Sequence, residues 1–223
     1  MNIDVNKFNT EGYIHLPNII PANYLEVAQS ITLKLKEETI SNNLLGTPKD
    51  FGSRIWWRGL EMASVQSSEL YNMYTSNFMY EIAKTLLETD DVYLFNDQIV
   101  VKLPNEDFKF EVHTDNSYGP NPPLAQQNGF KTITCAWILD DYTEDNGAVS
   151  ILNKRTREWE TPYPKMGDIV VWDGNTYHRS GINKSNKPRR GWVLVYANKD
   201  IVSLSLKQNE NGFKGKYYNK KFI

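Results

Sequence analysis

Two residues able to bind one metal ion stand close together near the middle of the chain. His113 and Asp115 end the alternating run Phe110-Glu111-Val112-His113-Thr114-Asp115. Residues two apart in a β-strand project from the same face, so the imidazole and the carboxylate could converge on one ion. Two histidines and one carboxylate on one face of an octahedron are the ligands of non-haem iron(II) oxygenases. The pair alone also fits an accidental His-x-Asp, or an aspartate that fixes a neighbouring histidine.

The second histidine of such a site has to come from elsewhere, and the chain contains only two more, His15 and His178. His15 has no acidic neighbour at ligand spacing, so we expect it to be structural or solvent-facing. His178 follows a segment that reads as turn, strand and turn, and it begins the next strand. Ser180 would share its strand face. Arg189 follows eleven positions later (189 − 178), where a hairpin could place its guanidinium beside a metal.

The composition argues against several classes of protein. The 223 residues carry a net charge of −2 with acids and bases interspersed, whereas a nucleic-acid binder needs a basic surface. An apolar content of 40% with 13% aromatics is enough for a folded core. The single cysteine, Cys135, rules out an internal disulfide framework and a cysteine-rich zinc site. Without a signal peptide or an apolar run of about 18 residues, we expect a soluble cytoplasmic protein that contacts no membrane.

Hydrophobic periodicity indicates the elements that position these residues. Helical spacing predicts amphipathic helices over 21–35 and 68–87, after a short strand that contains His15. Beyond Asp91 the pattern becomes strand-like. Two helices followed by about eight short strands predict an α+β fold with a closed or double-sheet β core, such as a jelly roll. The predicted strands cover residues 92–95, 98–103, 108–115, 130–139, 148–152, 169–172, 178–182 and 192–197.

We expect one domain over residues 1–223. Residues 1–90 would form mainly helical support, 91–200 the jelly-roll core, and 201–223 a basic aromatic tail. The tail could bind a polyanion, but we expect it to pack across the body with its lysines exposed. No GxGxxG or Walker pattern occurs, so a nucleotide site is not indicated.

The segment Arg54-Ile55-Trp56-Trp57-Arg58 places two indoles between two guanidiniums. It fits a surface strand whose Trp rings pack on the core beneath arginine stems. It also fits one wall of a substrate pocket, since Arg and Trp suit anionic or planar groups. Because substrate-defining groups tend to lie on loops around a rigid barrel, Arg54, Trp57 and Tyr118, with the loop 120–123, are candidate substrate contacts. The small body and near-neutral charge favour a small metabolite as substrate.

Several segments form an ordered pattern along the chain. They are Phe8-Asn9-Thr10-Glu11-Gly12-Tyr13; Val101-Lys102-Leu103-Pro104 running into His113-Thr114-Asp115; Trp137 to Gly147; Gly167-Asp168; and His178-Arg179-Ser180-Gly181 with Arg189. Over roughly residues 8 to 198 this pattern resembles the phytanoyl-CoA dioxygenase-like branch of the Fe(II)/2-oxoglutarate oxygenases. The combination is far more specific than His-x-Asp alone. The resemblance implies a double-stranded β-helix, which is a cupin-like jelly roll, with supporting N-terminal helices.

The resemblance also implies roles for individual residues. His113, Asp115 and His178 would bind iron(II) and leave coordination positions for 2-oxoglutarate and O2. Arg189 would grip the distal carboxylate of 2-oxoglutarate, helped by the hydroxyl of Ser180. A buried carboxylate needs such a partner, and the planar fork of arginine suits it better than lysine.

The chain departs from the family pattern in two places. The family's amide contact to the cosubstrate, six residues before Lys102, falls on Asn96 (102 − 6) in place of the usual glutamine, while Gln98 lies on the same strand face. The segment Ser150 to Arg155 replaces the family's Gly-Ser-His sequence. Both Asn96 and Gln98 are candidate cosubstrate contacts, and the trimmed segment predicts an open substrate mouth.

The predicted function is therefore an Fe(II)- and 2-oxoglutarate-dependent dioxygenase that hydroxylates, or otherwise oxidises, a small molecule with release of succinate and CO2. Halogenating relatives carry a small residue at the carboxylate position, so Asp115 predicts against halogenation. Two alternatives remain open at this level. One is a non-catalytic jelly-roll binding module with a vestigial metal site, and the other is a cupin-type metalloenzyme that needs no keto acid. The oligomeric state is not predicted.

Overall fold

The computed structural model describes residues 2–41, 64, 67–117, 129–199 and 220–221. Three predicted substrate contacts, Arg54, Trp57 and Tyr118, lie outside these residues, as does the loop 120–123. Most of the predicted tail also lies outside them.

Capping residues begin two of the described helices, α1 and α4. Asp4 caps the first helix by accepting a hydrogen bond from the Lys7 backbone N–H at 2.8 Å, and that helix ends at Gly12, whose φ of 85° is left-handed. Ser67 caps the helix Ser68–Tyr74 in the same way, because its hydroxyl oxygen accepts from the Leu70 backbone N–H. The α-helices are α1 (Val5–Glu11), α2 (Ala22–Ser41), α4 (Ser68–Tyr74) and α5 (Asn77–Leu87).

The prediction of one continuous helix over residues 68–87 is wrong in one respect, because this segment forms two helices, α4 and α5. Thr75 Oγ1 donates to Tyr71 O at 2.9 Å, and Ser76 Oγ donates to Met73 O at 2.7 Å. Such side-chain bonds to nearby backbone compete with the helical pattern and favour a helix end. Ser76 then occupies the N-cap position of α5.

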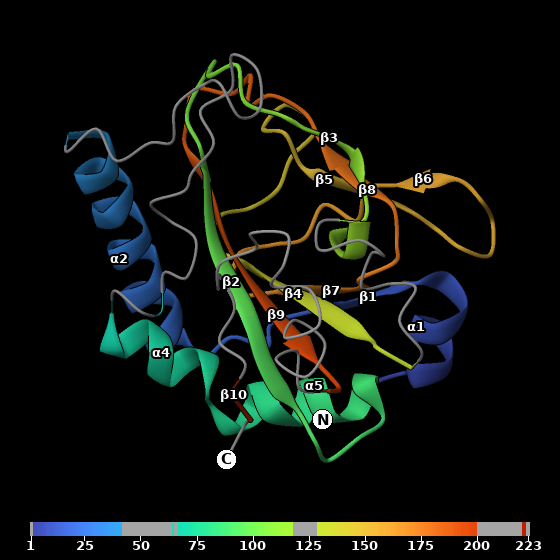
Figure 1. Ribbon diagram of the computed structural model, residues 1–223. Helices are drawn as coiled ribbons and strands as arrows, with labels where there is room; N and C mark the ends of the chain where they lie inside the picture. Colours follow the sequence, from blue (N-terminus) through green and yellow to red (C-terminus); the bar gives the residue numbers. More distant parts are fainter. Residues whose placement is uncertain (1, 42–63, 65–66, 118–128, 200–219, 222–223) are drawn as a thin grey trace, which may run out of the picture.

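In the described part of the chain, ten strands form two antiparallel sheets. Figure 1 shows how the sheets lie relative to each other. The larger sheet has the order β1-β7-β4-β9-β2-β10, and the smaller sheet has the order β3-β8-β5-β6. The larger sheet consists of β1 (Tyr13–Leu16), β2 (Tyr93–Lys102), β4 (Thr132–Ile138), β7 (Ile169–Asp173), β9 (Arg189–Ala197) and β10 (Lys220–Lys221). The smaller sheet consists of β3 (Phe110–His113), β5 (Val149–Leu152), β6 (Trp159–Glu160) and β8 (His178–Ser180).

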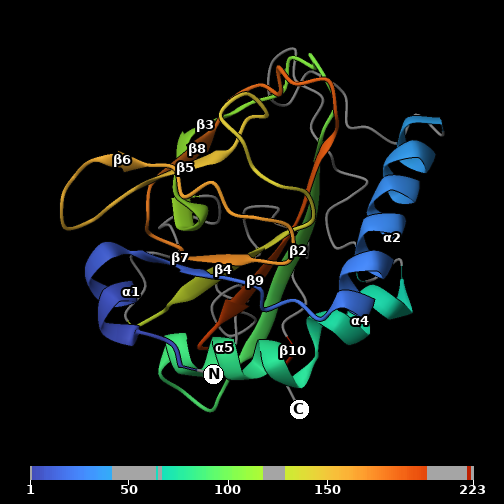
Figure 2. The ribbon, with the colours of Figure 1, turned by 180° about the vertical axis from the view of Figure 1, so that it is seen from behind.

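The larger sheet is covered on both faces. The helices α2 and α5 pack on one face, against β2, β9 and β4, and the smaller sheet lies on the other side, as Figures 1 and 2 show from opposite directions. Residues alternate along β4: Cys135 and Trp137 pack in the core beneath the helices, whereas Ala136 and Ile138 face the smaller sheet. All seven residues of β4 are therefore buried. The arrangement is the predicted α+β fold with a two-sheet β core.

Other details of the prediction need correction. The two strands predicted before residue 103 are one strand, β2, with an irregularity between Leu94 and Asn96. The strands β8 and β9 belong to different sheets, so Arg189 does not follow His178 in a hairpin. The two-residue strands β6 and β10 were not predicted, because they are too short to show a period. None of the described helices is long and apolar enough to cross a membrane.

Candidate metal centre and cosubstrate pocket

His113 and Asp115 come together through a turn rather than along one strand. His113 is the last residue of β3, and Asp115 begins a 3₁₀ turn, Asp115–Ser117. The expectation that both residues share one strand face is therefore wrong. The turn is held by Asn116, which is 2% exposed: its backbone N–H donates to Gly174 O at 3.0 Å, and its side-chain oxygen accepts from Thr132 Oγ1 at 2.8 Å.

The second histidine arrives from the neighbouring strand. His113 and His178 are register partners between β3 and β8, with ring centroids 4.2 Å apart. One ligand atom from each of His113, Asp115 and His178 can be chosen so that all lie within 4.8 Å of one another. His15, in contrast, lies on β1 and pairs with Asp168 at 2.7 Å. The structure thus brings together the three residues predicted as ligands and leaves His15 apart from them.

Both imidazoles are oriented by backbone carbonyls. His113 Nδ1 lies 2.6 Å from Glu111 O, and His178 Nδ1 lies 3.0 Å from Thr176 O. Because a carbonyl oxygen only accepts, each Nδ1 is the protonated nitrogen and each Nε2 is the nitrogen turned toward Asp115. Burial, and secondarily the nearby His178, lowers the pKa of His113 and so favours its neutral form. Neutral imidazole with a defined tautomer is the form that binds metal.

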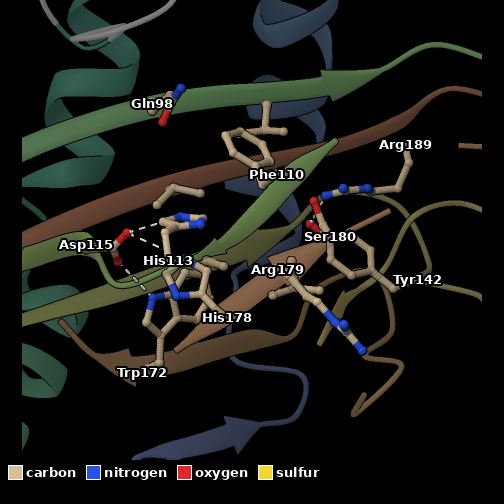
Figure 3. Close-up of a pocket in the computed structure, with 14 residues that line it drawn as sticks. Gln98, Phe110, His113, Asp115, Tyr142, Trp172, His178, Arg179, Ser180 and Arg189 are labelled. Carbon is tan, nitrogen blue, oxygen red and sulfur yellow. Dashed lines mark hydrogen bonds and ion pairs between the residues drawn. The ribbon is translucent and has the colours of Figure 1, made fainter. Parts of the chain in front are cut away.

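The two oxygens of the Asp115 carboxylate have different surroundings: one accepts hydrogen bonds from neighbouring side chains, and the other faces the histidines. Thr134 Oγ1 and Trp172 Nε1 donate to its Oδ2 at 2.6 and 2.8 Å. Its Oδ1 lies 3.4 Å from His178 Nε2 and 3.9 Å from His113 Nε2, on the side where the histidines converge (Figure 3). This arrangement presents one carboxylate oxygen and two imidazole nitrogens to a common point.

These ligands line one end of a cavity of about 70 Å³ between the two sheets. Arg189, Ser180 and Tyr142 lie at the other end, away from Asp115 (Figure 3). The walls between them are largely apolar and come from both sheets. They are formed by Val100, Phe110, Ala136, Val149 and Val193.

Arg189 is a buried cation without a counter-ion among the described residues. Its side chain is 2% exposed, Nη1 donates to Tyr142 Oη at 2.7 Å, and Nη2 donates to Gly147 O at 2.9 Å. Within the described part of the chain, Arg189 Nε and Ser180 Oγ have no hydrogen-bond partner although both atoms are buried. A buried charge and buried donors without partners are costly, so this end of the cavity fits an anion.

A second buried amine lies beside Arg189 but not in the cavity. Lys102 is the register partner of Arg189 between β2 and β9. Its Nζ donates to Phe108 O at 3.2 Å, to Ser180 O at 3.3 Å and to Gly181 O. Burial, and secondarily the charge of Arg189, lowers the pKa of Lys102 to about 6. Lys102 thereby links β2 to the segments that carry both histidines.

The two candidate amides are placed differently. Gln98 lines the cavity, and its Nε2 is buried without a partner among the described residues. Asn96 also has a buried unpartnered oxygen, Oδ1, but it does not line the cavity. Pairing of β2 with β9 is regular from Asn96 to Lys102, so strand parity counted from Lys102 gives both amides the same face and could not decide between them.

Sequence reasoning missed three residues of this site: Thr134, Trp172 and Tyr142. Thr134 and Trp172 are register partners on β4 and β7, and Ala136, two residues from Thr134, faces the same interior. Strand parity could therefore have placed Thr134 in the barrel. The contacts of Trp172 and Tyr142 depend on how the two sheets pack, which no local pattern encodes.

The residues present fit the iron and cosubstrate that the resemblance implied. Two imidazole nitrogens and one carboxylate oxygen match the donor set of an iron(II) site. The cation and the unpartnered donors at the far end match a carboxylate, which accepts through two oxygens. The observation that decides the fit is the occurrence of both features in one cavity.

Comparisons with known proteins agree with this arrangement. The sequence profile of "Phytanoyl-CoA dioxygenase (PhyH)" matches residues 8–191. No curated protein matches the chain as a sequence.

Solved structures similar to this one include two enzymes of nogalamycin biosynthesis. The non-haem alpha ketoglutarate dependent carbocyclase SnoK is 18% identical, with a TM-score of 0.71, covering 89% of this chain and 85% of SnoK. The epimerase SnoN is 16% identical, with a TM-score of 0.68, covering 86% of this chain and 80% of SnoN.

EctD from S. alaskensis, solved with 2-oxoglutarate and 5-hydroxyectoine, is 19% identical, with a TM-score of 0.67, covering 86% of this chain and 74% of EctD. These likenesses confirm the predicted jelly-roll fold. From its family match, the chain belongs to the phytanoyl-CoA dioxygenase (PhyH) family and is an iron(II)- and 2-oxoglutarate-dependent oxygenase.

Proposed function

We propose that His113, Asp115 and His178 bind the iron(II) and that Arg189 and Ser180 bind the distal carboxylate of 2-oxoglutarate. The observation that carries this proposal is one cavity with a three-residue donor set at one end and, at the other, a buried guanidinium that has no anionic partner among the described residues. Gln98 lines the same cavity with a free N–H, so we assign the amide contact to Gln98 in place of Asn96.

The protein groups hold the reactants in a fixed geometry. Glu111 O and Thr176 O fix the imidazole tautomers, and Thr134 and Trp172 occupy the second oxygen of Asp115. When bound, iron(II) with 2-oxoglutarate and O2 supplies oxidative decarboxylation to succinate and CO2, coupled to oxidation of a C–H bond.

Charge balance supports the same assignment. Asp115 contributes one negative charge beside a divalent cation, and 2-oxoglutarate brings two carboxylates. With one carboxylate at the metal, the other would require a cation deep in the barrel. Arg189 is buried at that position and has no anionic partner among the described residues.

We further propose that the substrate is a small molecule and that the outcome is hydroxylation or another oxidation without halogenation. Two similar proteins were solved with small molecules: SnoN with Fe3+, alpha ketoglutarate and nogalamycin RO, and EctD with 5-hydroxyectoine. Asp115 occupies the position that halogenation would need vacant. Arg54, Trp57 and Tyr118 stay predictions as substrate contacts, and a cytoplasmic location and a single domain stay predictions as well.

The test is succinate formation from 2-oxoglutarate in air with added Fe(II), first without substrate and then with pools of small metabolites. We expect succinate from the native protein and at least a hundredfold less from His178→Ala and Asp115→Ala. His15→Gln, which alters a histidine outside the cavity, should match the native protein. Equal succinate from the native protein and both ligand variants would refute the assignment, and a chlorinated product would refute the proposed outcome.

A further inference from the structure

The closed end of the cavity contains a third donor that the proposed function does not use. Tyr142 is 3% exposed and lines the cavity beside Arg189 and Ser180 (Figure 3). Its ring packs on the guanidinium, with Arg189 Cζ 4.4 Å from the ring centroid. Its hydroxyl oxygen accepts from Arg189 Nη1 at 2.7 Å.

The hydroxyl proton of Tyr142 has no acceptor among the described residues. A tyrosine hydroxyl both accepts and donates, and here its oxygen already accepts from the guanidinium. Three donors therefore lie together without acceptors within the described part of the chain: the Tyr142 hydroxyl, Ser180 Oγ and Arg189 Nε. A carboxylate has enough lone pairs to accept from all three.

The neighbouring strand β9 has a glycine where the Tyr142 hydroxyl approaches it. A Cβ added to Gly191, two residues after Arg189 on β9, would lie 2.6 Å from Tyr142 Oη. A side chain at this position would therefore displace the hydroxyl. The glycine allows the close approach.

Tyr142 also lines a second, smaller cavity. This apolar cavity of about 10 Å³ is lined by Tyr142 together with Ile138, Ile151, Pro162, Pro164 and Val170. Ala136, Val149 and Trp172 line both cavities, so the two adjoin each other. Removing the ring, which lines both cavities and packs on Arg189, would enlarge the space beside the guanidinium.

We propose that Tyr142 donates to the distal carboxylate of 2-oxoglutarate and that its ring sets the length of the 2-oxo diacid that binds. This inference rests on the proposed function, because it assumes that Arg189 and Ser180 bind that carboxylate. It adds a donor to the site and assigns the choice among diacids of different length to one side chain.

The experiment measures dissociation constants by anaerobic calorimetry on the Fe(II)-loaded protein. The probes are 2-oxoglutarate, pyruvate, which lacks the distal carboxylate, and 2-oxoadipate, which is one methylene longer. Tyr142→Phe should raise the dissociation constant of 2-oxoglutarate by about tenfold or more, as expected for loss of a hydrogen bond to a charged group. Pyruvate binding should not change. Tyr13→Phe removes a buried hydroxyl that instead contacts Glu160, so its affinities should equal those of the native protein.

Two further variants separate the parts of the proposal. In an Arg189→Ala background, Tyr142→Phe should still weaken the binding of 2-oxoglutarate. If it has no effect on binding there, the hydroxyl acts only through the guanidinium. Tyr142→Ala should increase the affinity for 2-oxoadipate relative to that for 2-oxoglutarate by at least tenfold. General destabilisation of the protein would not change this ratio. An unchanged ratio would overturn the length assignment.

The remaining outcomes distinguish this inference from the proposed function. If Arg189→Ala weakens 2-oxoglutarate but Tyr142→Phe does not, Tyr142 is no donor and the proposed function stands. If the native Fe(II) protein binds no 2-oxoglutarate, both are overturned.

Discussion

At the scale of single residues, the site depends on side chains that control the candidate ligands without binding the metal themselves. Asp115 is the clearest case, because Thr134 and Trp172 hold one of its oxygens and leave the other facing the histidines. The identity of His113, His178 and Arg189 could be predicted from residue type and order. Strand parity could have placed Thr134 in the barrel, but the contacts of Thr134 and Trp172 with Asp115 depend on how the two sheets pack.

Removing either donor should loosen the metal site. We expect Thr134→Val and Trp172→Phe each to weaken Fe(II) binding by about tenfold, within the range known for partners of metal ligands. An anaerobic Fe(II) titration measures this, with Trp159→Phe, on the outer strand β6, as the control. Unchanged affinity in both variants would show that Asp115 is held by other means.

The buried amine of Lys102 gives stability a specific pH dependence. Its pKa is about 6 in the folded protein against 10.5 for a free lysine, so the unfolded chain binds the extra proton between these values. The free energy of unfolding should therefore rise with pH from about 6 to about 10, by about 1.4 kcal/mol per pH unit from this group.

Urea unfolding of the metal-free protein at several pH values measures that slope. Lys102→Met should remove the contribution, whereas Lys165→Met, at an exposed lysine, should keep it. Parallel curves for the native protein and Lys102→Met would contradict the burial argument. The same variant leaves the carbonyls of Phe108, Ser180 and Gly181 without a donor, so its absolute stability should also fall.

At the scale of elements, periodicity predicted most helices and strands but not the features that complete the site. The division between α4 and α5 follows from local hydroxyl bonds of Thr75 and Ser76. The turn at Asp115 follows from contacts of Asn116 with β4 and with the loop after β7. The first is readable in principle from residue type, whereas the second requires the assembled sheets.

The turn itself can be tested through Asn116. Asn116→Ala removes the acceptor of Thr132 Oγ1 and the donor to Asn175 Oδ1, and it should cost about 1–3 kcal/mol of stability. Fe(II) affinity should fall as well, because Asp115 begins the same turn. Urea unfolding and Fe(II) titration measure the two effects. A stability loss without any change in Fe(II) affinity would show that the Asn116 turn is not needed to position Asp115 for metal binding.

At the scale of the whole molecule, two sheets bring three distant parts of the chain to one cavity. The β3 segment supplies His113 and Asp115, β8 supplies His178 and Ser180, and β9 supplies Arg189. The sequence order of these residues indicated the family, and the family implied the fold. Which side chains close the cavity, Tyr142 above all, depends on inter-sheet packing and became visible only in three dimensions.

The most direct test of this account is anaerobic absorption spectroscopy of the protein with Fe(II), before and after addition of 2-oxoglutarate. The account predicts a visible metal-to-ligand charge-transfer band in the native protein. The band should be absent in His178→Ala and should require much more 2-oxoglutarate in Arg189→Ala. A native protein that binds Fe(II) but gives no band at any 2-oxoglutarate concentration would contradict the account, as would a band in Arg189→Ala with native affinity.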